Sequence, residues 1–243
     1  VASVMISNDK TFRGVAPDAY LYSAAIGDLT EFTGQQEECL ASQHIALQNS
    51  GDVRATNFSF GEPLSRDERP NATLDGNALL TQCIDWSSRV HKLLYVIAGN
   101  QGRGGIPIPT DNFNGINVAY SRRTQEGRFV RVDAANLTSE PPASATQGPS
   151  IESNVGPRRS INLVAPGSEI EMFDPNGTRI TSSGTSFAAP HVVATVALLQ
   201  EFGDRQFREG VSNWSLDSRE PLVMKSVILN SADKREDTGD GLL

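Results

Sequence analysis

The sequence predicts an α/β domain with three layers, in which helices cover both faces of a mostly parallel β-sheet. Apolar runs of strand length alternate with helical patterns along the chain, an order typical of such sheets. Several runs are apolar at consecutive positions, as in Leu-Leu-Tyr-Val-Ile-Ala at 93–98, a composition that strands covered on both faces have. The 243 residues, 38% of them hydrophobic, suit one domain of the larger kind.

The strands and helices follow from the periodicity of apolar residues. Leu79, Cys83, Trp86 and Val90 fall at spacings of four, three and four, which predicts one apolar stripe of a helix over 79–90. Residues 187–202 are apolar nearly all round, so we expect a buried helix there. Polar residues at 205–220 indicate a surface insertion, and turn residues mark loops at 102–112, 141–150 and 174–178. The remaining expected helices are 35–47 and 221–230, and the expected strands are 20–26, 53–60, 93–98, 116–120, 129–134 and 161–165.

Charge and hydropathy exclude several classes of protein. The net charge is −8 with a pI near 4.9, and the basic residues are scattered, so nothing indicates a nucleic-acid partner. We interpret the acidity as a contribution to solubility. No apolar run approaches the roughly 18 residues that a membrane span requires. The first residues lack the zones of a signal peptide and begin inside an apolar stretch, so we interpret the sequence as part of a longer chain.

The chain has two cysteines, Cys39 and Cys83. They could pair, but two cysteines in a chain of this size do not make a disulfide framework. We therefore favour two separate, half-buried thiols on helices. The cysteines leave the compartment open.

The segment Gly-Thr-Ser-Phe-Ala-Ala-Pro-His at 184–191 carries the strongest chemical signal. Ser186 falls in the first turn of the expected apolar helix. Backbone N–H groups at a helix start have no partner inside the helix, and the helix dipole favours negative charge there. A serine that attacks a carbonyl from this position creates its oxyanion in a favourable place. For an isolated Gly-Thr-Ser the alternative is a helix cap.

The whole segment resembles the nucleophile motif of the subtilisin family of serine proteases. Residues 14–26, 54–63, 93–102 and 153–170 resemble further family segments in the same order. The resemblance covers almost the entire chain and implies a partial subtilisin-like peptidase domain over 1–243. It implies a serine endopeptidase that hydrolyses polypeptides through an acyl-enzyme at Ser186. A hydrolase that uses a Gly-x-Ser-x-Gly elbow is disfavoured, because Ala188 stands where that elbow needs its second glycine.

The resemblance also assigns residues around the nucleophile. The Asn100 amide and the Ser186 backbone N–H would form the oxyanion hole. Ser59, Phe60 and Gly61 would form the strand edge to which the substrate backbone pairs. Ala98 and Gly99 would line the pocket for the residue before the scissile bond.

The general base and its orienting carboxylate are the missing parts of this site. In the family order, Asp and then His would precede Val1. We interpret His44, His91 and His191 as structural. The isolated chain is therefore expected to have no appreciable peptidase activity. The competing hypothesis is a catalytically inactive, peptide-binding or scaffold protein with the protease fold.

The resemblance requires no cofactor. Many relatives bind calcium near the loop that corresponds to 6–13, where Asn8 and Asp9 could supply oxygen ligands, but a solvated turn is the favoured interpretation. No His/Cys cluster indicates zinc. The resemblance slightly favours a secreted or cell-envelope protein, and the sequence gives no oligomeric state.

Overall fold

The computed structural model describes most of the chain. The described residues are 1–26, 34–99, 107–131, 158, 160–233, 236–237 and 241–242.

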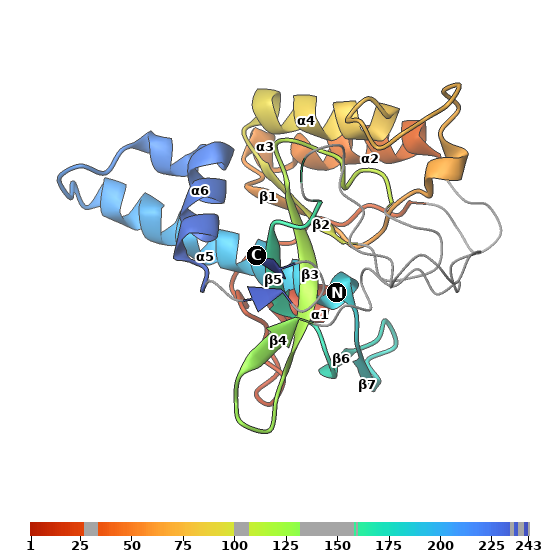
Figure 1. Cartoon of the computed structure of the whole chain (residues 1–243). Coiled ribbons are helices and arrows are strands. Elements are labelled where there is room, and N and C mark those ends of the chain that lie inside the picture. Colours follow the sequence, from red (N-terminus) through yellow and green to blue (C-terminus); the bar gives the residue numbers. More distant parts are fainter. Residues whose placement is uncertain are drawn as a thin grey trace.

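A central, mostly parallel sheet organises the domain (Figure 1). Strands β1 (Ala55–Phe58), β2 (Leu94–Ala98) and β3 (Ile116–Arg123) are parallel neighbours in that order. Beyond β3, β5 (Leu163–Pro166) pairs parallel to it and β4 (Phe129–Arg131) pairs antiparallel. This sheet confirms the predicted fold class.

The side chains of β2 alternate between two apolar layers. All five residues of β2 are buried, as its continuous apolar run predicts. One layer joins Leu94 and Val96 to α5 (Thr185–Arg208) and α6 (Pro221–Ser231). The other joins Tyr95 and Ile97 to helices on the opposite face of the sheet.

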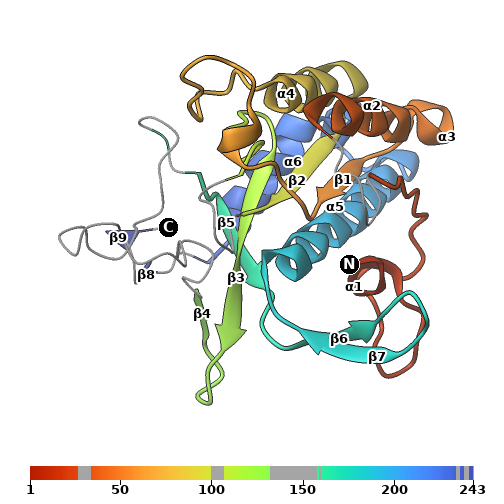
Figure 2. The same cartoon turned by 90° about the vertical axis from the view of Figure 1, so that its right-hand side faces the viewer.

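Those opposite helices are α2 (Gln35–Ala46) and α4 (Leu79–His91), which lie side by side in Figures 1 and 2. The hairpin of β6 (Ile170–Phe173) and β7 (Arg179–Ser182) turns at 174–178, as predicted. Residues 205–220 are mostly exposed, although α5 extends into them as far as Arg208. The remaining elements are α1 (Ala2–Ile6), α3 (Gln48–Gly51), η1 (Leu64–Arg66), η3 (Leu216–Arg219), β8 (Glu236–Asp237) and β9 (Gly241–Leu242).

The strand predicted at 20–26 is wrong. The segment has no regular secondary structure, and Tyr20 is 94% exposed. An apolar run becomes a strand only when its backbone pairs with a neighbour, and no strand among the described residues pairs with this one.

The helix predicted at 79–90 is confirmed, but of its predicted stripe only Cys83 is buried. Leu79, Trp86 and Val90 are each more than half exposed. The buried face is formed instead by Leu80 and Ile84, which pack into the β2 layer. The sequence offers two apolar stripes on this helix, and contact with the sheet selects between them.

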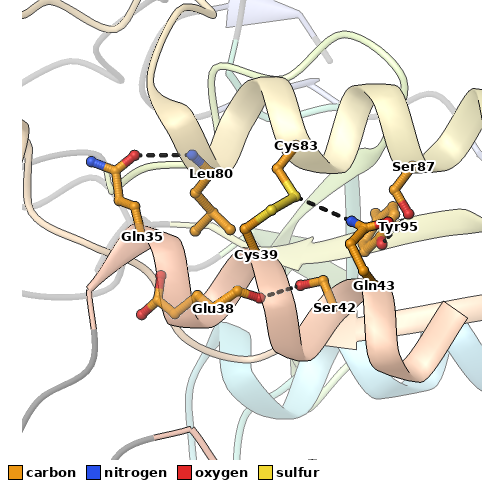
Figure 3. The surroundings of a disulfide bond; sticks show 9 residues. All are labelled: Gln35, Glu38, Cys39, Ser42, Gln43, Leu80, Cys83, Ser87 and Tyr95. Carbon is orange, nitrogen blue, oxygen red and sulfur yellow. Dashed lines mark hydrogen bonds between the residues drawn. A yellow bond between two sulfur atoms is a disulfide. The ribbon is translucent and has the colours of Figure 1, made fainter.

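The prediction of two separate thiols is also wrong. Cys39 of α2 and Cys83 of α4 form a disulfide, with their Cα atoms 5.9 Å apart (Figure 3). Because α2 and α4 run side by side, residues 44 positions apart in sequence meet between them. The Nε2 atom of Gln43 donates a hydrogen bond to the Cys83 sulfur at 3.1 Å.

A buried pair of carboxyl groups lies next to the disulfide. Glu38, beside Cys39, is 3% exposed, and Glu62 is 5% exposed. Burial, together with a hydrogen bond and repulsion from Glu62, raises the pKa of Glu38 to about 8. Arg66 approaches the Glu62 carboxylate at 3.3 Å. Burial beside Glu62 therefore favours the protonated form of Glu38.

Reduction of the disulfide is expected to lower the free energy of unfolding by roughly 4 kcal/mol, because it frees a loop of this length in the unfolded chain. Urea unfolding with and without dithiothreitol measures the difference. The doubly substituted variant Cys39→Ala/Cys83→Ala is the control and should not respond to dithiothreitol. Equal unfolding midpoints for the oxidised and reduced chain would contradict the link between α2 and α4.

The Glu38→Gln variant is expected to be more stable than the native chain at alkaline pH. The raised pKa of Glu38 means that the folded state holds a proton that the unfolded state loses, so native stability falls as pH rises from about 4.5 to about 8. A glutamine is neutral throughout, so its relative gain grows over that range and reaches a few kcal/mol. Unfolding midpoints across pH measure it. The exposed Glu37→Gln variant is the matched control, and a pH-independent difference for Glu38→Gln would count against the raised pKa of Glu38.

Candidate active site

The turn before α5 places Ser186 in the first turn of that helix. Gly184, the residue before α5, has φ 149° and ψ 168°, a conformation that side-chain-bearing residues rarely adopt. Its N–H donates to the Gly167 carbonyl at 2.7 Å. A Cβ on Gly167 would lie 2.5 Å from the Tyr120 Cβ, so this approach also requires a glycine. The two glycines together fix where α5 begins.

Thr185 joins the start of α5 to the end of β2. Its side chain is fully buried, and its Oγ1 donates to the Gly99 carbonyl at 2.7 Å. Gly99 in turn donates its N–H to Val118 of β3 at 2.8 Å. The helix is thereby anchored to the carboxyl edge of the central strands.

Ser186 meets the end of β1 through two hydrogen bonds. Its Oγ donates to the Ser59 carbonyl at 3.3 Å, and the Ser59 Oγ donates to the Ser186 carbonyl at 2.9 Å. The Asn57 amide donates to the Ser59 Oγ at 2.8 Å. Asn57, Ser59 and Ser186 are therefore linked across the junction of sheet and helix by side-chain hydrogen bonds, two of which end on backbone carbonyls.

The position of Ser186 suits chemistry that develops negative charge. The side chain is half-buried, and it lies at the N-terminal end of a helix of 24 residues. The backbone N–H groups of a first helical turn and the positive end of the helix dipole both stabilise an anion at such a place. The arrangement can hold a hydroxyl nucleophile beside an oxyanion.

The residues predicted to bind substrate lie at the same edge of the sheet. Ser59, Phe60 and Gly61 continue from β1 as half-buried, irregular chain, with the Phe60 ring stacked on Phe58 at 4.7 Å. A Cβ on Gly61 would lie 2.5 Å from the Pro107 Cβ, so a glycine is needed for this approach.

Of the two residues predicted to line a substrate pocket, Ala98 ends β2 and Gly99 follows it. Ala98 is 5% exposed, and a Cβ on Gly99 would lie 2.5 Å from the Ile161 Cδ1. The structure thus brings Gly99, Ser59 and Ser186 to one junction. Asn100, the predicted oxyanion donor, lies outside the described residues.

The three histidines make their contacts elsewhere. The His191 Nδ1 lies 2.7 Å from the Phe187 carbonyl in the same helix, and burial lowers its pKa. The His44 ring contacts Gln48 at 3.2 Å, and the His91 ring packs edge-on against Trp86. None of these contacts includes the Ser186 hydroxyl.

Two residues of the junction were not singled out from the sequence. Asn57 orients Ser59, and its place in the Asn-x-Ser-x-Gly pattern was a signal that could have identified it. Thr185 directly precedes the nucleophile candidate, and its position in the sequence indicates only the turn into the helix or a helix cap. Its bond to Gly99 depends on spatial neighbours that a sequence pattern does not specify.

The candidate calcium loop is organised by its own backbone. The Asp9 carboxylate accepts N–H groups from Thr11 and Phe12 at 2.8 and 2.9 Å, which lower its pKa. Within the described ranges, no group of three or more His, Cys, Asp or Glu side chains is placed to hold a metal ion. A calcium ion at Asn8 and Asp9 stays a prediction. Across the same part of the chain, no helix combines the length and apolar character needed to cross a bilayer.

Known proteins share both the sequence and the fold. The Subtilase family model matches residues 1–242. The intracellular serine protease of Paenibacillus polymyxa is 35% identical over 97% of this chain and 61% of its own length. Subtilisin E of Bacillus subtilis (strain 168) is 26% identical over 80% of this chain and 42% of its own length. The chain therefore spans about two-fifths to three-fifths of the length of these relatives.

Two solved structures have the same fold at lower sequence identity. The patellamide maturation protease PatA is 22% identical with a TM-score of 0.67, over 98% of this chain and 73% of that one. The A-subunit of the AB5 toxin from E. coli is 19% identical with a TM-score of 0.64, over 99% and 73%. With the family model matched almost from end to end, the chain belongs to the subtilase family of serine peptidases.

Proposed function

We propose that this chain is the nucleophile-bearing part of a serine endopeptidase and that Ser186 is its nucleophile. The observation that carries the proposal is the junction at which Ser186, in the first turn of α5, exchanges hydrogen bonds with Ser59 at the end of β1. The alternative role of Ser186, a helix cap, is disfavoured because Gly184 occupies the N-cap position of α5.

In the proposed reaction the Ser186 Oγ attacks the carbonyl carbon of a peptide bond while a general base accepts its proton. The tetrahedral intermediate collapses, the C–N bond breaks, and the base returns the proton to the leaving amine. Water then attacks the acyl-enzyme and restores the serine. We place the base, a histidine, and the aspartate that orients it before Val1, since the contacts of His44, His91 and His191 lie elsewhere.

The oxyanion formed in this step needs donors that point at it. We assign this role to the Ser186 backbone N–H and the Asn100 amide. Asn100 directly follows Gly99, whose carbonyl is bound by Thr185 beside the nucleophile. This connection supports the assignment, because Asn100 is bonded directly to a residue of the junction that holds Ser186.

We propose that the acyl side of the substrate pairs with Ser59, Phe60 and Gly61, and that the side chain before the scissile bond lies near Ala98 and Gly99. Both segments end neighbouring strands of the sheet and therefore meet at the edge where Ser186 lies. On this account the isolated chain is inactive. The competing function is a peptide-binding scaffold that keeps the substrate edge without turnover.

The disulfide between Cys39 and Cys83 supports a protein that works in an oxidising compartment, because thiols inside cells are kept reduced. We therefore propose a location outside the cytosol, unlike the relative from Paenibacillus polymyxa that is named as intracellular.

A fluorophosphonate probe tests the proposed nucleophile. We expect labelling of a chain extended upstream to include the histidine and aspartate, at Ser186 by mass spectrometry, because only the complete site activates the hydroxyl. The extended Ser186→Ala variant is the matched control and should stay unlabelled, as should residues 1–243 alone. An extended chain that is folded but unlabelled would favour the scaffold over the enzyme.

A further inference from the structure

Pro190 lies inside α5, beyond the first turn of the helix. In an α-helix the N–H of each residue donates to the carbonyl four positions earlier, so the position of Pro190 corresponds to the Ser186 carbonyl. Proline has no N–H, and its ring also crowds that carbonyl. The helix therefore does not supply its usual donor to the residue that is proposed as the nucleophile.

The side chain of Ser59 supplies a donor in its place. From just after the end of β1, the Ser59 Oγ donates to the Ser186 carbonyl at 2.9 Å. A hydroxyl group has one proton, so it donates to one acceptor at a time and uses its oxygen for any further hydrogen bond. The contact with Ser186 therefore depends on where the Ser59 proton points.

Asn57 keeps the Ser59 proton in this direction. Its Nδ2 lies 2.8 Å from the Ser59 Oγ, and an amide NH₂ group can only donate, so it occupies the hydroxyl oxygen and leaves the proton for Ser186. Asn57 belongs to β1 and pairs with Val96 of β2, on the face of the sheet that α5 covers. A residue of the sheet thus sets the direction of the bond to the helix.

The backbone of Ser186 is held on both sides. Before it, the Thr185 Oγ1 donates to the Gly99 carbonyl at 2.7 Å. After it, the Ser59 Oγ binds the Ser186 carbonyl. These contacts restrict φ and ψ of Ser186, which set the directions of its N–H and of its side chain. Both groups act in the proposed reaction, the N–H at the oxyanion and the Oγ as the nucleophile.

We propose that Asn57 and the Ser59 hydroxyl are positioning groups of this site, which hold the Ser186 backbone where Pro190 removes its helical donor. Without this hydrogen bond the first turn of α5 can shift. A displacement of about 1 Å at a reacting group can cost about a hundredfold in rate. The effect on rate rests on the proposed function, whereas the hydrogen bonds themselves belong to the fold.

The rate of labelling by a fluorophosphonate probe, measured per folded molecule in the chain extended upstream, tests this role. Asn57→Asp nearly keeps the shape of the side chain but replaces the donor with an acceptor, so the Ser59 proton turns away from Ser186. We expect labelling to be about tenfold slower or more. Asn176→Asp makes the same chemical change in the exposed turn between β6 and β7, and should label at the native rate.

Pro190→Ala separates positioning from a merely structural role, because it returns an N–H to the helix opposite the Ser186 carbonyl. Ser59→Ala should slow labelling by about tenfold in the native background. In the Pro190→Ala background the same substitution should slow it by about threefold or less, since the helix then supplies the donor. Ser59→Thr keeps the hydroxyl group and should label at close to the native rate.

The chemical shift of the Ser186 carbonyl carbon, read by NMR in the same extended chain, needs no activity. It should move in Asn57→Asp and in Ser59→Ala, and stay constant in Asn176→Asp. If the native extended chain is folded but unlabelled, the proposed function fails, and the carbonyl shift alone then decides on the hydrogen bonds.

Either of two results would overturn the positioning role. One is a native labelling rate with an unchanged carbonyl shift in Asn57→Asp. The other is an equal loss of labelling from Ser59→Ala with and without Pro190, which would assign Ser59 a structural role that does not act through the Ser186 carbonyl.

Discussion

The junction between the end of β1 and the first turn of α5 is the contact on which the rest of the site depends. Ser59 and Ser186 exchange hydrogen bonds there, and Thr185 binds the carbonyl that follows β2. These bonds fix the helix start against the carboxyl edge of the sheet. The apolar layer formed by α5 and the sheet then buries the rest of the helix and holds the junction in register.

A second set of contacts fixes the substrate side of this junction. The disulfide joins α2 to α4, and burial together with the neighbouring Glu62 raises the pKa of the Glu38 carboxyl group next to it. Glu62 directly follows the proposed substrate segment and pairs with Ile108 through both backbone groups. The segment after β1 therefore lies against α2 as well as α5.

The sequence alone was sufficient to predict those elements whose structure depends on a local pattern of residues. The helix start at Ser186 and the buried run of β2 both follow from composition and spacing over a few residues. The sequence could not predict which face of α4 points outward. Leu79 and Leu80 begin two competing apolar stripes, and only contact with β2 selects one of them. Contacts between segments far apart in the chain could not be predicted from the sequence either. The disulfide, the Glu38–Glu62 contact and the unpaired state of 20–26 all depend on which elements become neighbours.

The most direct test of this account is an experimental structure of the chain, read at the junction of β1 and α5. The account predicts that the Ser59 Oγ lies within hydrogen-bond distance of the Ser186 carbonyl, at 2.9 Å, and that Gly184 keeps its positive φ. A structure in which α5 begins elsewhere, or in which Ser59 and Ser186 are separated by more than a hydrogen bond, would contradict it. The proposed nucleophile would then lack the support on which its chemistry depends.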